Sequence, residues 1–192
     1  AGEFEVSFPT DKILIADDTV EGIERALARL LADPTVDLVL AGGPISSHLA
    51  ARRPLLPKPV IAPLIVDPEL QGIPLQGQAS GIENLSYITY PASTPTTLKL
   101  FKEIAPFKKV ALLASRSILD AIPELASHYI AAGSSMGVEV VAVPVAATAA
   151  SVLEALTPDL EGVFIGLPLN LPDAEIEPLV EGLIARRLPS FW

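Results

Sequence analysis

The sequence contains no cysteine and has only two histidines, His48 and His128, among its 192 residues. Without thiols the chain forms no disulfide and offers no thiolate ligands to zinc or an iron–sulfur cluster. Each histidine falls in a segment with helical spacing, and neither has another histidine near it in the sequence. Metal and catalytic sites need convergent side chains. We therefore expect no metal, no cofactor and no catalytic residue.

Positive charge and long apolar runs are also scarce. The chain has 13 Lys and Arg against 23 Asp and Glu, a formal net charge of −10. Nucleic acids and anionic membranes attract basic patches, so neither is an expected partner. Half of the residues are hydrophobic, yet none of the apolar runs reaches the roughly 18 residues of a membrane span. We expect no direct membrane insertion, and the apolar excess instead predicts buried strands and helices.

Short apolar runs alternate with segments of helical spacing. The clearest run, residues 108–117, ends in Ser115, Arg116 and Ser117. Because its apolar residues do not alternate with polar ones, it predicts a strand buried on both faces of a parallel sheet. Similar strands are expected over residues 36–41, 59–66, 82–90, 138–143, 160–166 and 188–192, with an edge strand at 4–8, a short apolar run at 12–16 and a surface loop at 69–80.

Apolar residues at helical spacing predict helices over residues 20–31, 46–53, 96–104, 118–132, 148–156 and 172–185. The strand–helix rhythm occurs twice, which predicts an α/β protein with two parallel sheets. We place a lobe at 1–92 and another at 93–192, with a hinge near 88–96, where prolines favour extended chain. Residues 36–66 also parallel residues 163–192 as an internal strand–helix–strand repeat.

Five motifs then follow one another along the chain: residues 37–44 (DLVLAGGP), 65–68 (IVDP), 80–86 (SGIENLS), 100–106 (LFKEIAP) and 137–145 (GVEVVAVPV). In this order they resemble the type I periplasmic solute-binding proteins of ABC uptake systems, in the branch that binds aromatic amino acids or similar solutes. The resemblance implies two doubly wound, Rossmann-like lobes linked by a hinge, a small-molecule ligand and an extracytoplasmic, periplasmic location.

The chain also departs from this family. The resemblance implies a first strand–helix unit before residue 5 and a C-terminal part beyond residue 192, so the chain is expected to be truncated at both ends. Gly43-Pro44 stands where relatives often carry Thr-Pro, and residues 167–170 replace a Thr-Asp-Asn-like turn. Each change removes a polar ligand contact, which predicts an altered pocket.

Ligands of open α/β sheets bind beyond the carboxyl ends of the strands. The candidate ligand-binding residues follow from that rule and from the resemblance: Gly43, Pro44, Ser46, Ser47, Asp67, Ser115, Arg116, Ser117 and Asn170. Backbone N–H groups and serines at a helix start suit a carboxylate, and Arg116 suits the same group as a bidentate partner. Asp67 suits an amine. The alternatives are an ordinary strand-to-helix turn, a solvated arginine and a turn-forming aspartate before Pro68.

The sequence thus predicts a non-catalytic module that binds a small polar, amino-acid-like solute between its lobes for an ABC permease. Tyr87 and Trp192 are further candidates, since each can stack on an aromatic solute. A second hypothesis is a ligand-sensing or accessory domain fused within a larger envelope protein, such as a receptor or an efflux component, with a site that no longer binds. A doubly wound enzyme is disfavoured, because no metal set or dinucleotide fingerprint is visible.

Overall fold

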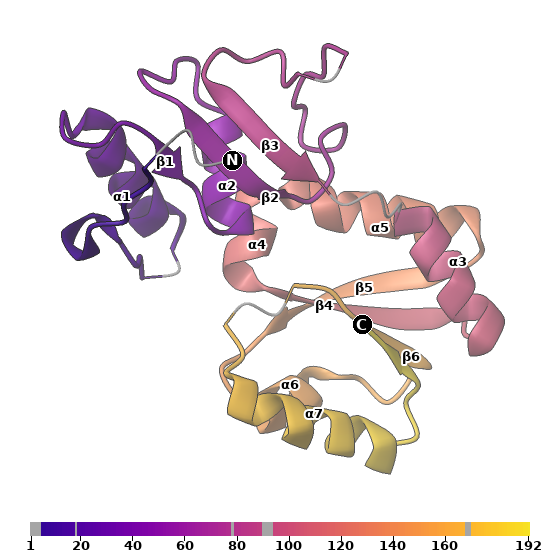
Figure 1. Cartoon of the computed structure of the whole chain (residues 1–192). Coiled ribbons are helices and arrows are strands. Elements are labelled where there is room, and N and C mark those ends of the chain that lie inside the picture. Colours follow the sequence, from indigo (N-terminus) through magenta and orange to yellow (C-terminus); the bar gives the residue numbers. More distant parts are fainter. Residues whose placement is uncertain (1–4, 18, 78, 90–93, 168–169) are drawn as a thin grey trace. The chain divides into compact units, whose positions relative to one another are not determined.

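The computed structural model describes residues 5–17, 19–77, 79–89, 94–167 and 170–192. The chain divides into two compact units, Ala1–Tyr90 and Pro91–Trp192, which are coloured from indigo to magenta and from magenta to yellow in Figure 1. Residues 90–93 of the expected hinge lie outside the described residues, and so does the lobe boundary placed after residue 92.

Unit 1 contains a three-stranded parallel sheet in the order β1-β2-β3. Its strands are β1 (Val39–Leu40), β2 (Val60–Ile65) and β3 (Leu85–Thr89). The pairs Val39–Val60 and Val60–Leu85 set the register. Helix α1 (Val20–Ala32) precedes β1, helix α2 (Pro44–Ala51) connects β1 to β2, and a short 3-10 helix, η1 (Thr10–Lys12), lies near the N-terminus.

Hydrogen bonds from side chains fix both ends of helix α1. The hydroxyl of Thr19 accepts a hydrogen bond from the Gly22 N–H at 3.0 Å, which satisfies one of the free donors of the first turn. Beyond the last turn, the Lys58 ammonium donates to the carbonyl oxygens of Asp33 and, at 2.7 Å, Val36. A cation at this end also favours the helix dipole, so Lys58 fixes the path from α1 into β1.

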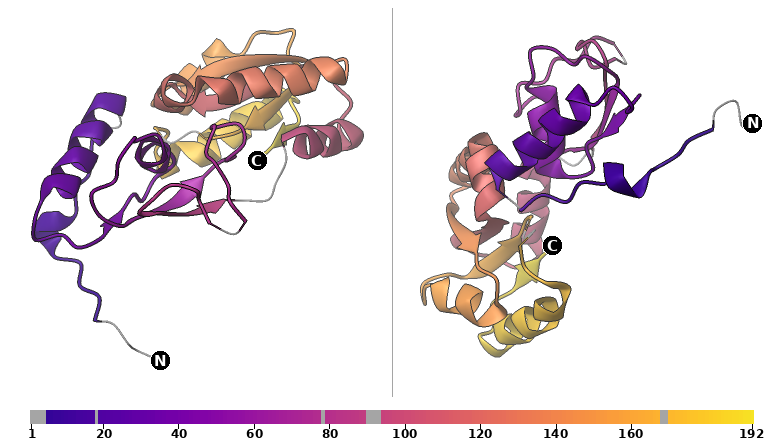
Figure 2. Two further views of the ribbon diagram at one scale, coloured as in Figure 1. Left: turned by 90° about the horizontal axis from the view of Figure 1, so that it is seen from above. Right: turned by 90° about the vertical axis from the view of Figure 1, so that its left-hand side faces the viewer.

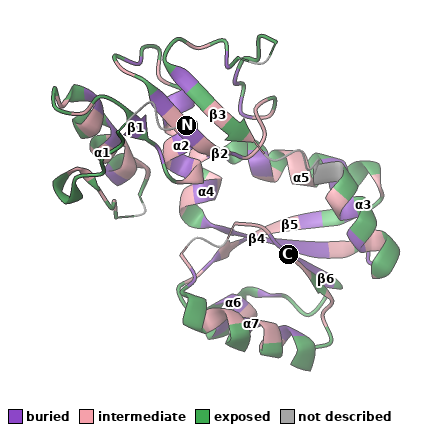
Figure 3. Cartoon of the chain, in the orientation of Figure 1, coloured by how far each residue is buried: buried purple, intermediate pink, exposed green. Residues whose placement is uncertain are grey.

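The core of unit 1 lies on one face of its sheet, the face that α1 and α2 cover. Val39 and Ala41 of the β1 segment, with Val60 and Ala62 of β2, are buried there together with leucines of α1. Leu38 and Leu40 alternate with them and are exposed. Figure 3 shows exposed residues alternating with buried or partly buried ones along β3 in the same way. One face of the unit 1 sheet is therefore open.

Three expectations for unit 1 are wrong. Residues 5–8 are exposed and no strand is present among them, because period-2 alternation forms a strand only beside a partner strand. The run 36–41 pairs only as the two-residue β1 and is buried on one face rather than both. The loop at 69–80 is not wholly on the surface, since Gln71, Ile73 and Ser80 are buried.

Unit 2 contains a four-stranded parallel sheet in the order β5-β4-β6-β7. Its strands are β4 (Lys109–Ser115), β5 (Glu139–Val145), β6 (Gly162–Ile165) and β7 (Ser190–Phe191). The central strand β4 pairs with β5 along seven residues and with β6 along four. The helices are α3 (Thr94–Ile104), α4 (Arg116–Ala121), α5 (Pro123–Ser135), α6 (Ala149–Ala155) and α7 (Asp173–Ala185).

Both faces of the unit 2 sheet are covered. Ala111 and Leu113 of β4 pack with residues of α6 and α7 in one core. Val110 and Leu112, on the opposite face of the same strand, pack with the aromatic residues of a second core that includes α3. Figure 1 shows α6 and α7 on one side of this sheet and α3 and α5 on the other. The prediction that residues 108–117 contain a strand buried on both faces is confirmed.

Two expectations for unit 2 are wrong in part, and each concerns an element that contains a proline. The helix expected over residues 118–132 is two helices, because the chain bends at Ile122 and restarts with Pro123 in the first turn of α5. The strand expected to end before Pro144 continues through it to Val145. Strand β5 is an edge strand, where a residue without an N–H is tolerated.

Candidate functional site

The turn from β1 into α2 carries four candidate residues. Gly43 is the N-cap of α2 and Pro44 its first residue. The Ser46 hydroxyl accepts a hydrogen bond from the Gly43 N–H at 2.9 Å, so Ser46 closes the start of the helix. The Ser47 hydroxyl is fully buried, donates to the Ala41 carbonyl at 2.9 Å and accepts from the Leu64 N–H at 3.2 Å. Ser46 therefore caps α2, whereas Ser47 holds α2 against the end of β1 and against β2.

Asp67 follows the end of β2 and orders the turn after it. Its carboxylate accepts a hydrogen bond from the Leu70 N–H at 2.9 Å, and its own N–H donates to the Gln71 side-chain oxygen at 2.9 Å. The Gln71 amide nitrogen lies 2.8 Å from His48 Nδ1. Because the oxygen of that amide is fixed by the Asp67 N–H, its nitrogen donates and Nδ1 accepts, which assigns the His48 proton to Nε2.

Unit 2 places three candidates at the carboxyl end of β4. The strand order reverses here, since β5 lies on one side of β4 and β6 on the other. Such a reversal is the switch point where open α/β sheets bind ligands. The Ser115 N–H donates to the Leu167 carbonyl at 2.9 Å, which joins the ends of β4 and β6. The buried Ser115 hydroxyl accepts from the Ile118 N–H at 3.3 Å and lies 3.2 Å from the Ser117 hydroxyl.

Arg116 is the first residue of α4 and its side chain is exposed. Among the residues that the structure describes, none forms a hydrogen bond or ion pair with its guanidinium group. It lies between Ser115 and Ser117 in sequence, beside the switch point. The group is therefore free to pair with an anion of a ligand.

Asn170 reaches the same edge of the unit 2 sheet from the segment after β6. Its amide nitrogen donates to the Val145 carbonyl at the end of β5 at 2.7 Å. Its amide oxygen is buried and has no hydrogen-bond partner, so the oxygen can accept from a donor of a ligand. Residues 168 and 169 of the predicted turn lie outside the described residues.

Perturbed ionisable groups lie at the other end of the unit 2 sheet. The Lys109 ammonium is 2.8 Å from the Asp159 carboxylate and 2.9 Å from the Glu139 carboxylate. The hydrogen bond from Lys109, followed by one from Thr157, lowers the pKa of Asp159 to about 2. Lys109 and Glu139 stand at the amino ends of β4 and β5. These groups stabilise the sheet and do not face the candidate residues at its carboxyl edge.

The remaining features add no catalytic chemistry to either edge. Residues 133–137 have the spacing Gly-x-Ser-x-Gly of a hydrolase elbow, which the sequence reasoning missed. They end α5, and the Ser135 hydroxyl donates to the Ala132 carbonyl at 2.7 Å, so no strand-to-helix elbow forms. Trp192 is exposed, and the Tyr87 hydroxyl is buried without a hydrogen-bond partner.

The described residues lack two features. They contain no cluster of three or more histidine, aspartate or glutamate side chains that could hold a metal ion. None of the helices in the described ranges is both long enough and apolar enough to cross a membrane. The sequence reasoning overlooked Gln71, because no pattern distinguishes a buried glutamine in a loop from an exposed one.

Three solved structures resemble the whole architecture. An ABC domain from Streptococcus pneumoniae in complex with L-Trp matches with a TM-score of 0.60 and 20% identity, over 89% of this chain and 59% of that one. The fold is that of a two-lobe periplasmic binding protein. A conserved domain protein from Vibrio cholerae matches with a TM-score of 0.55 and 16% identity, over 90% of this chain and 56% of that one.

The third neighbour is a ligand-free, open substrate-binding protein with adhesive properties from Clostridium difficile. Its TM-score is 0.50 and its identity 16%, over 89% of this chain and 57% of that one. The chain thus spans less than two thirds of the length of each neighbour. No protein-family model matches the chain, and no curated protein matches its sequence. The predicted α/β fold class is confirmed by the two parallel sheets and by these likenesses.

Proposed function

We propose that this chain is a non-catalytic, extracytoplasmic binding module for a small polar, amino-acid-like solute. The observation that carries the proposal is Arg116, which follows β4 at the switch point of the unit 2 sheet and whose guanidinium forms no ion pair with a described residue. A guanidinium binds a carboxylate through two parallel hydrogen bonds. The likeness to a structure in complex with L-Trp supports the same class of solute.

In this proposal charged and polar side chains of the chain pair with the charged groups of the solute. Arg116, with Ser115 and Ser117 beside it, takes the carboxylate of the solute, and the Asn170 oxygen accepts a hydrogen bond from an N–H or O–H group of the solute. One carboxylate oxygen of Asp67 caps its own turn, which leaves the second to accept the ammonium group.

The Ser46 and Ser47 hydroxyls have a narrower role in this proposal than the sequence suggested. Both are engaged in hydrogen bonds within unit 1. Gly43 and Pro44 with these serines would shape the wall of the site through the backbone rather than through side-chain contacts. The whole protein would deliver its solute to an ABC permease outside the cytoplasm.

The proposal is tested by thermal unfolding in the presence of the twenty L-amino acids and small dicarboxylates. A solute that binds the folded state stabilises it by about 2.7 kcal/mol at a hundredfold excess over its Kd, so one group of solutes should raise the Tm. The methyl ester and the N-acetyl derivative of that solute are matched controls. Each loses one charged group, and neither should raise the Tm.

A second candidate is a ligand-sensing or accessory domain of a larger envelope protein whose site no longer binds. The observation that favours it is the internal use of both serine hydroxyls at the start of α2. An unchanged Tm with every solute would favour this candidate over the first.

A further inference from the structure

Two hydroxyl groups of strand β3, those of Tyr87 and Thr89, are buried without a hydrogen-bond partner among the described residues. We refer to them as the β3 hydroxyl pair. A buried hydroxyl without a partner has lost its hydrogen bonds to water, so it destabilises the fold. Phenylalanine and valine would fill almost the same volume without that penalty. Unpaired buried groups are rare in folded proteins, and two of them on one short strand call for an explanation.

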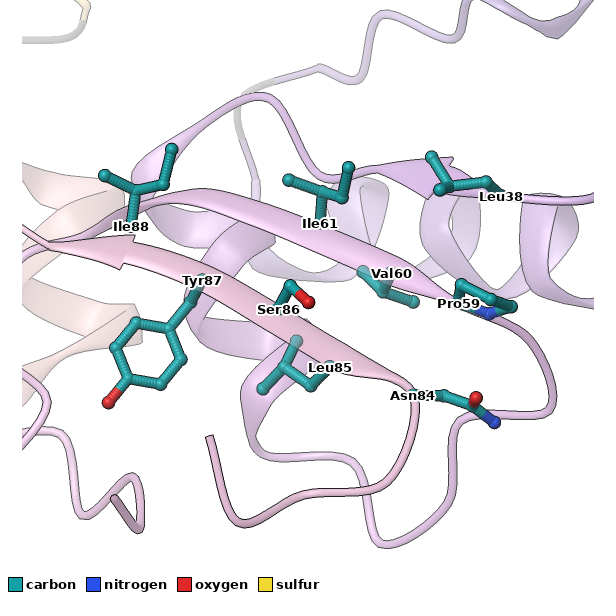
Figure 4. Close-up of a pocket in the computed structure, with 9 residues that line it drawn as sticks. All are labelled: Leu38, Pro59, Val60, Ile61, Asn84, Leu85, Ser86, Tyr87 and Ile88. Atoms are coloured by element: carbon teal, nitrogen blue, oxygen red, sulfur yellow. The ribbon is translucent and has the colours of Figure 1, made fainter. Parts of the chain in front are cut away.

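Both side chains of the pair project from the same face of β3. Residues two apart along a strand share a face, and Figure 4 shows the Tyr87 ring on the side of Leu85, opposite Ile61 and Ile88. Leu85 belongs to the core of unit 1, and Tyr87 packs against that core. Helix α2 contributes to the same core, and Figure 2 shows it beside the strands of unit 1. The pair therefore lies on the covered face of the sheet.

The strand register places the pair at the carboxyl edge of the unit 1 sheet. Tyr87 is the neighbour of Ala62 and Thr89 is the neighbour of Ile65, so β2 has one more residue than β3 between these pairs. Bulges of this kind often re-aim side chains beside a binding site. Asp67 follows Ile65 by two residues. The pair and the carboxylate proposed to take the ammonium group thus lie at one edge of one sheet.

Other polar side chains buried near this edge are hydrogen-bonded: Ser47, His48 and Gln71. The Ser47 hydroxyl accepts from the N–H of Leu64, a residue of the bulge. The Gln71 side-chain oxygen accepts from the N–H of Asp67. These bonds hold the edge together within unit 1. The β3 hydroxyl pair takes no part in them, so it is free to bind a group from outside the chain.

The pair lies close beneath the surface. Tyr87 and Thr89 are each partly exposed as residues, although their hydroxyl oxygens are covered. A rotation of either side chain between its rotamers can bring the oxygen to the surface. Thr89 is the last residue of β3, and ligands of open α/β sheets bind just beyond the carboxyl ends of the strands. A solute at this edge therefore reaches both hydroxyls.

The chemistry of the pair selects one class of side chain on the solute. An apolar side chain would leave both hydroxyls unpaired. A charged side chain would leave water for a site of neutral hydroxyls beside an apolar core, which is strongly unfavourable, and an acidic one would also face Asp67. A neutral hydroxyl, amide or N–H group pairs with the two hydroxyls, because each of them both donates and accepts.

We propose that the β3 hydroxyl pair binds a neutral hydrogen-bonding group on the side chain of the solute. Since this role rests on the proposed function, it applies to amino-acid-like solutes and selects serine, threonine, asparagine, glutamine, tyrosine or tryptophan among them. A site that hydrogen-bonds such a group discriminates strongly against an analogue without it, because the polar groups of the site are then buried unpaired.

Matched pairs of L-amino acids test this selectivity by thermal unfolding. Threonine is compared with valine, tyrosine with phenylalanine, glutamine with methionine, and tryptophan with 3-benzothienylalanine, so that each pair differs mainly in the neutral polar group. At least one polar member should raise the Tm, and its apolar partner should need at least a tenfold higher concentration for the same rise. Equal rises within every responding pair, or a rise with charged amino acids only, would overturn the proposal.

Variants of the chain locate the contact. Tyr87→Phe and Thr89→Val each remove one hydroxyl and keep the shape of the side chain, so both variants should fold with a Tm equal to that of the parent chain or higher. By titration calorimetry, each should bind the responding polar amino acid about tenfold more weakly. Ser86→Ala is the matched control, because Ser86 is exposed between the pair on β3, and it should bind as the parent chain does.

The two measurements separate this role from the proposed function. A structural role of the hydroxyls predicts the opposite result, a lower Tm of the free variants with unchanged affinity, and that result in both would overturn the proposal. If the parent chain binds an amino acid and Asp67→Asn alone weakens binding, the proposed function stands and the role of the pair is wrong. If none of the twenty amino acids raises the Tm, the proposed function is contradicted and this role with it.

Discussion

The hydrogen bonds of two serine hydroxyl groups distinguish a structural role from a ligand contact in unit 1. A serine beside a glycine-rich turn suits both a ligand contact and a helix cap, and the sequence pattern is the same for each. In the structure, Ser46 caps α2 and Ser47 links α2 to β1 and β2. Arg116 differs, because its charge is not paired with any residue that the structure describes. At the residue scale the proposed recognition of a solute carboxylate therefore depends more on unit 2.

The charge cluster at the amino end of β4 makes a prediction about acid stability. The Asp159 pKa is lowered to about 2 by its hydrogen bond from Lys109. A lowered carboxyl pKa stabilises the folded chain above its ordinary value of about 3.9, and this stabilisation disappears as pH falls through about 2. Lys109→Met should lower the Tm by a few degrees near neutral pH. The Tm difference from the parent chain should shrink as the pH falls from about 4 to about 2.

Lys108→Met is the control for this measurement, since Lys108 is the exposed neighbour of Lys109. Its Tm should follow that of the parent chain at every pH. A constant difference between Lys109→Met and the parent from neutral pH to strong acid would show that the Lys109 ion pairs are not the cause.

At the element scale, close packing of α5 on β5 depends on one glycine. A Cβ atom at Gly133 would lie 2.9 Å from the Val138 carbonyl oxygen and closer still to a Val140 methyl group. Overpacking of this kind costs about 1–3 kcal/mol. Gly133→Ala should therefore lower the urea midpoint of unfolding by the corresponding amount.

Gly42→Ala is the matched substitution, because no heavy atom lies within 4 Å of a Cβ atom built at that position. It should leave the midpoint unchanged or raise it slightly, since alanine reduces the entropy of the unfolded chain. Equal losses for both variants would mean that the α5–β5 approach does not restrict residue 133.

The elements also show what the sequence could and could not specify. Buried runs such as residues 109–115 predict their strands correctly, because burial on both faces leaves a continuous apolar signature. Pro123 and Pro144 were harder to interpret. The same residue begins a helix in one place and lies inside a strand in the other, and the second is tolerated only because the sheet order makes β5 an edge.

At the scale of the whole molecule, the repeated rhythm of strands and helices was sufficient to predict two parallel sheets. It could not reveal that one face of the unit 1 sheet is open, because the exposed residues Leu38 and Leu40 are as apolar as buried ones. The candidate site was predictable as a set of strand ends. Its hydrogen bonds were not, since Ser47, Gln71 and Asn170 each have one partner that lies 17 to 25 residues away in the sequence.

The central claim is the proposal that a solute is bound through the charges of Asp67 and Arg116. Titration calorimetry tests it most directly, with the solute that raises the Tm and with the variants Asp67→Asn and Arg116→Gln. Each variant removes one charge-assisted hydrogen bond, so each should weaken binding about tenfold or more. Glu69→Gln and Arg187→Gln, exposed neutralisations in the same units, should bind as the parent chain does. Unchanged affinity in either Asp67→Asn or Arg116→Gln would contradict the claim.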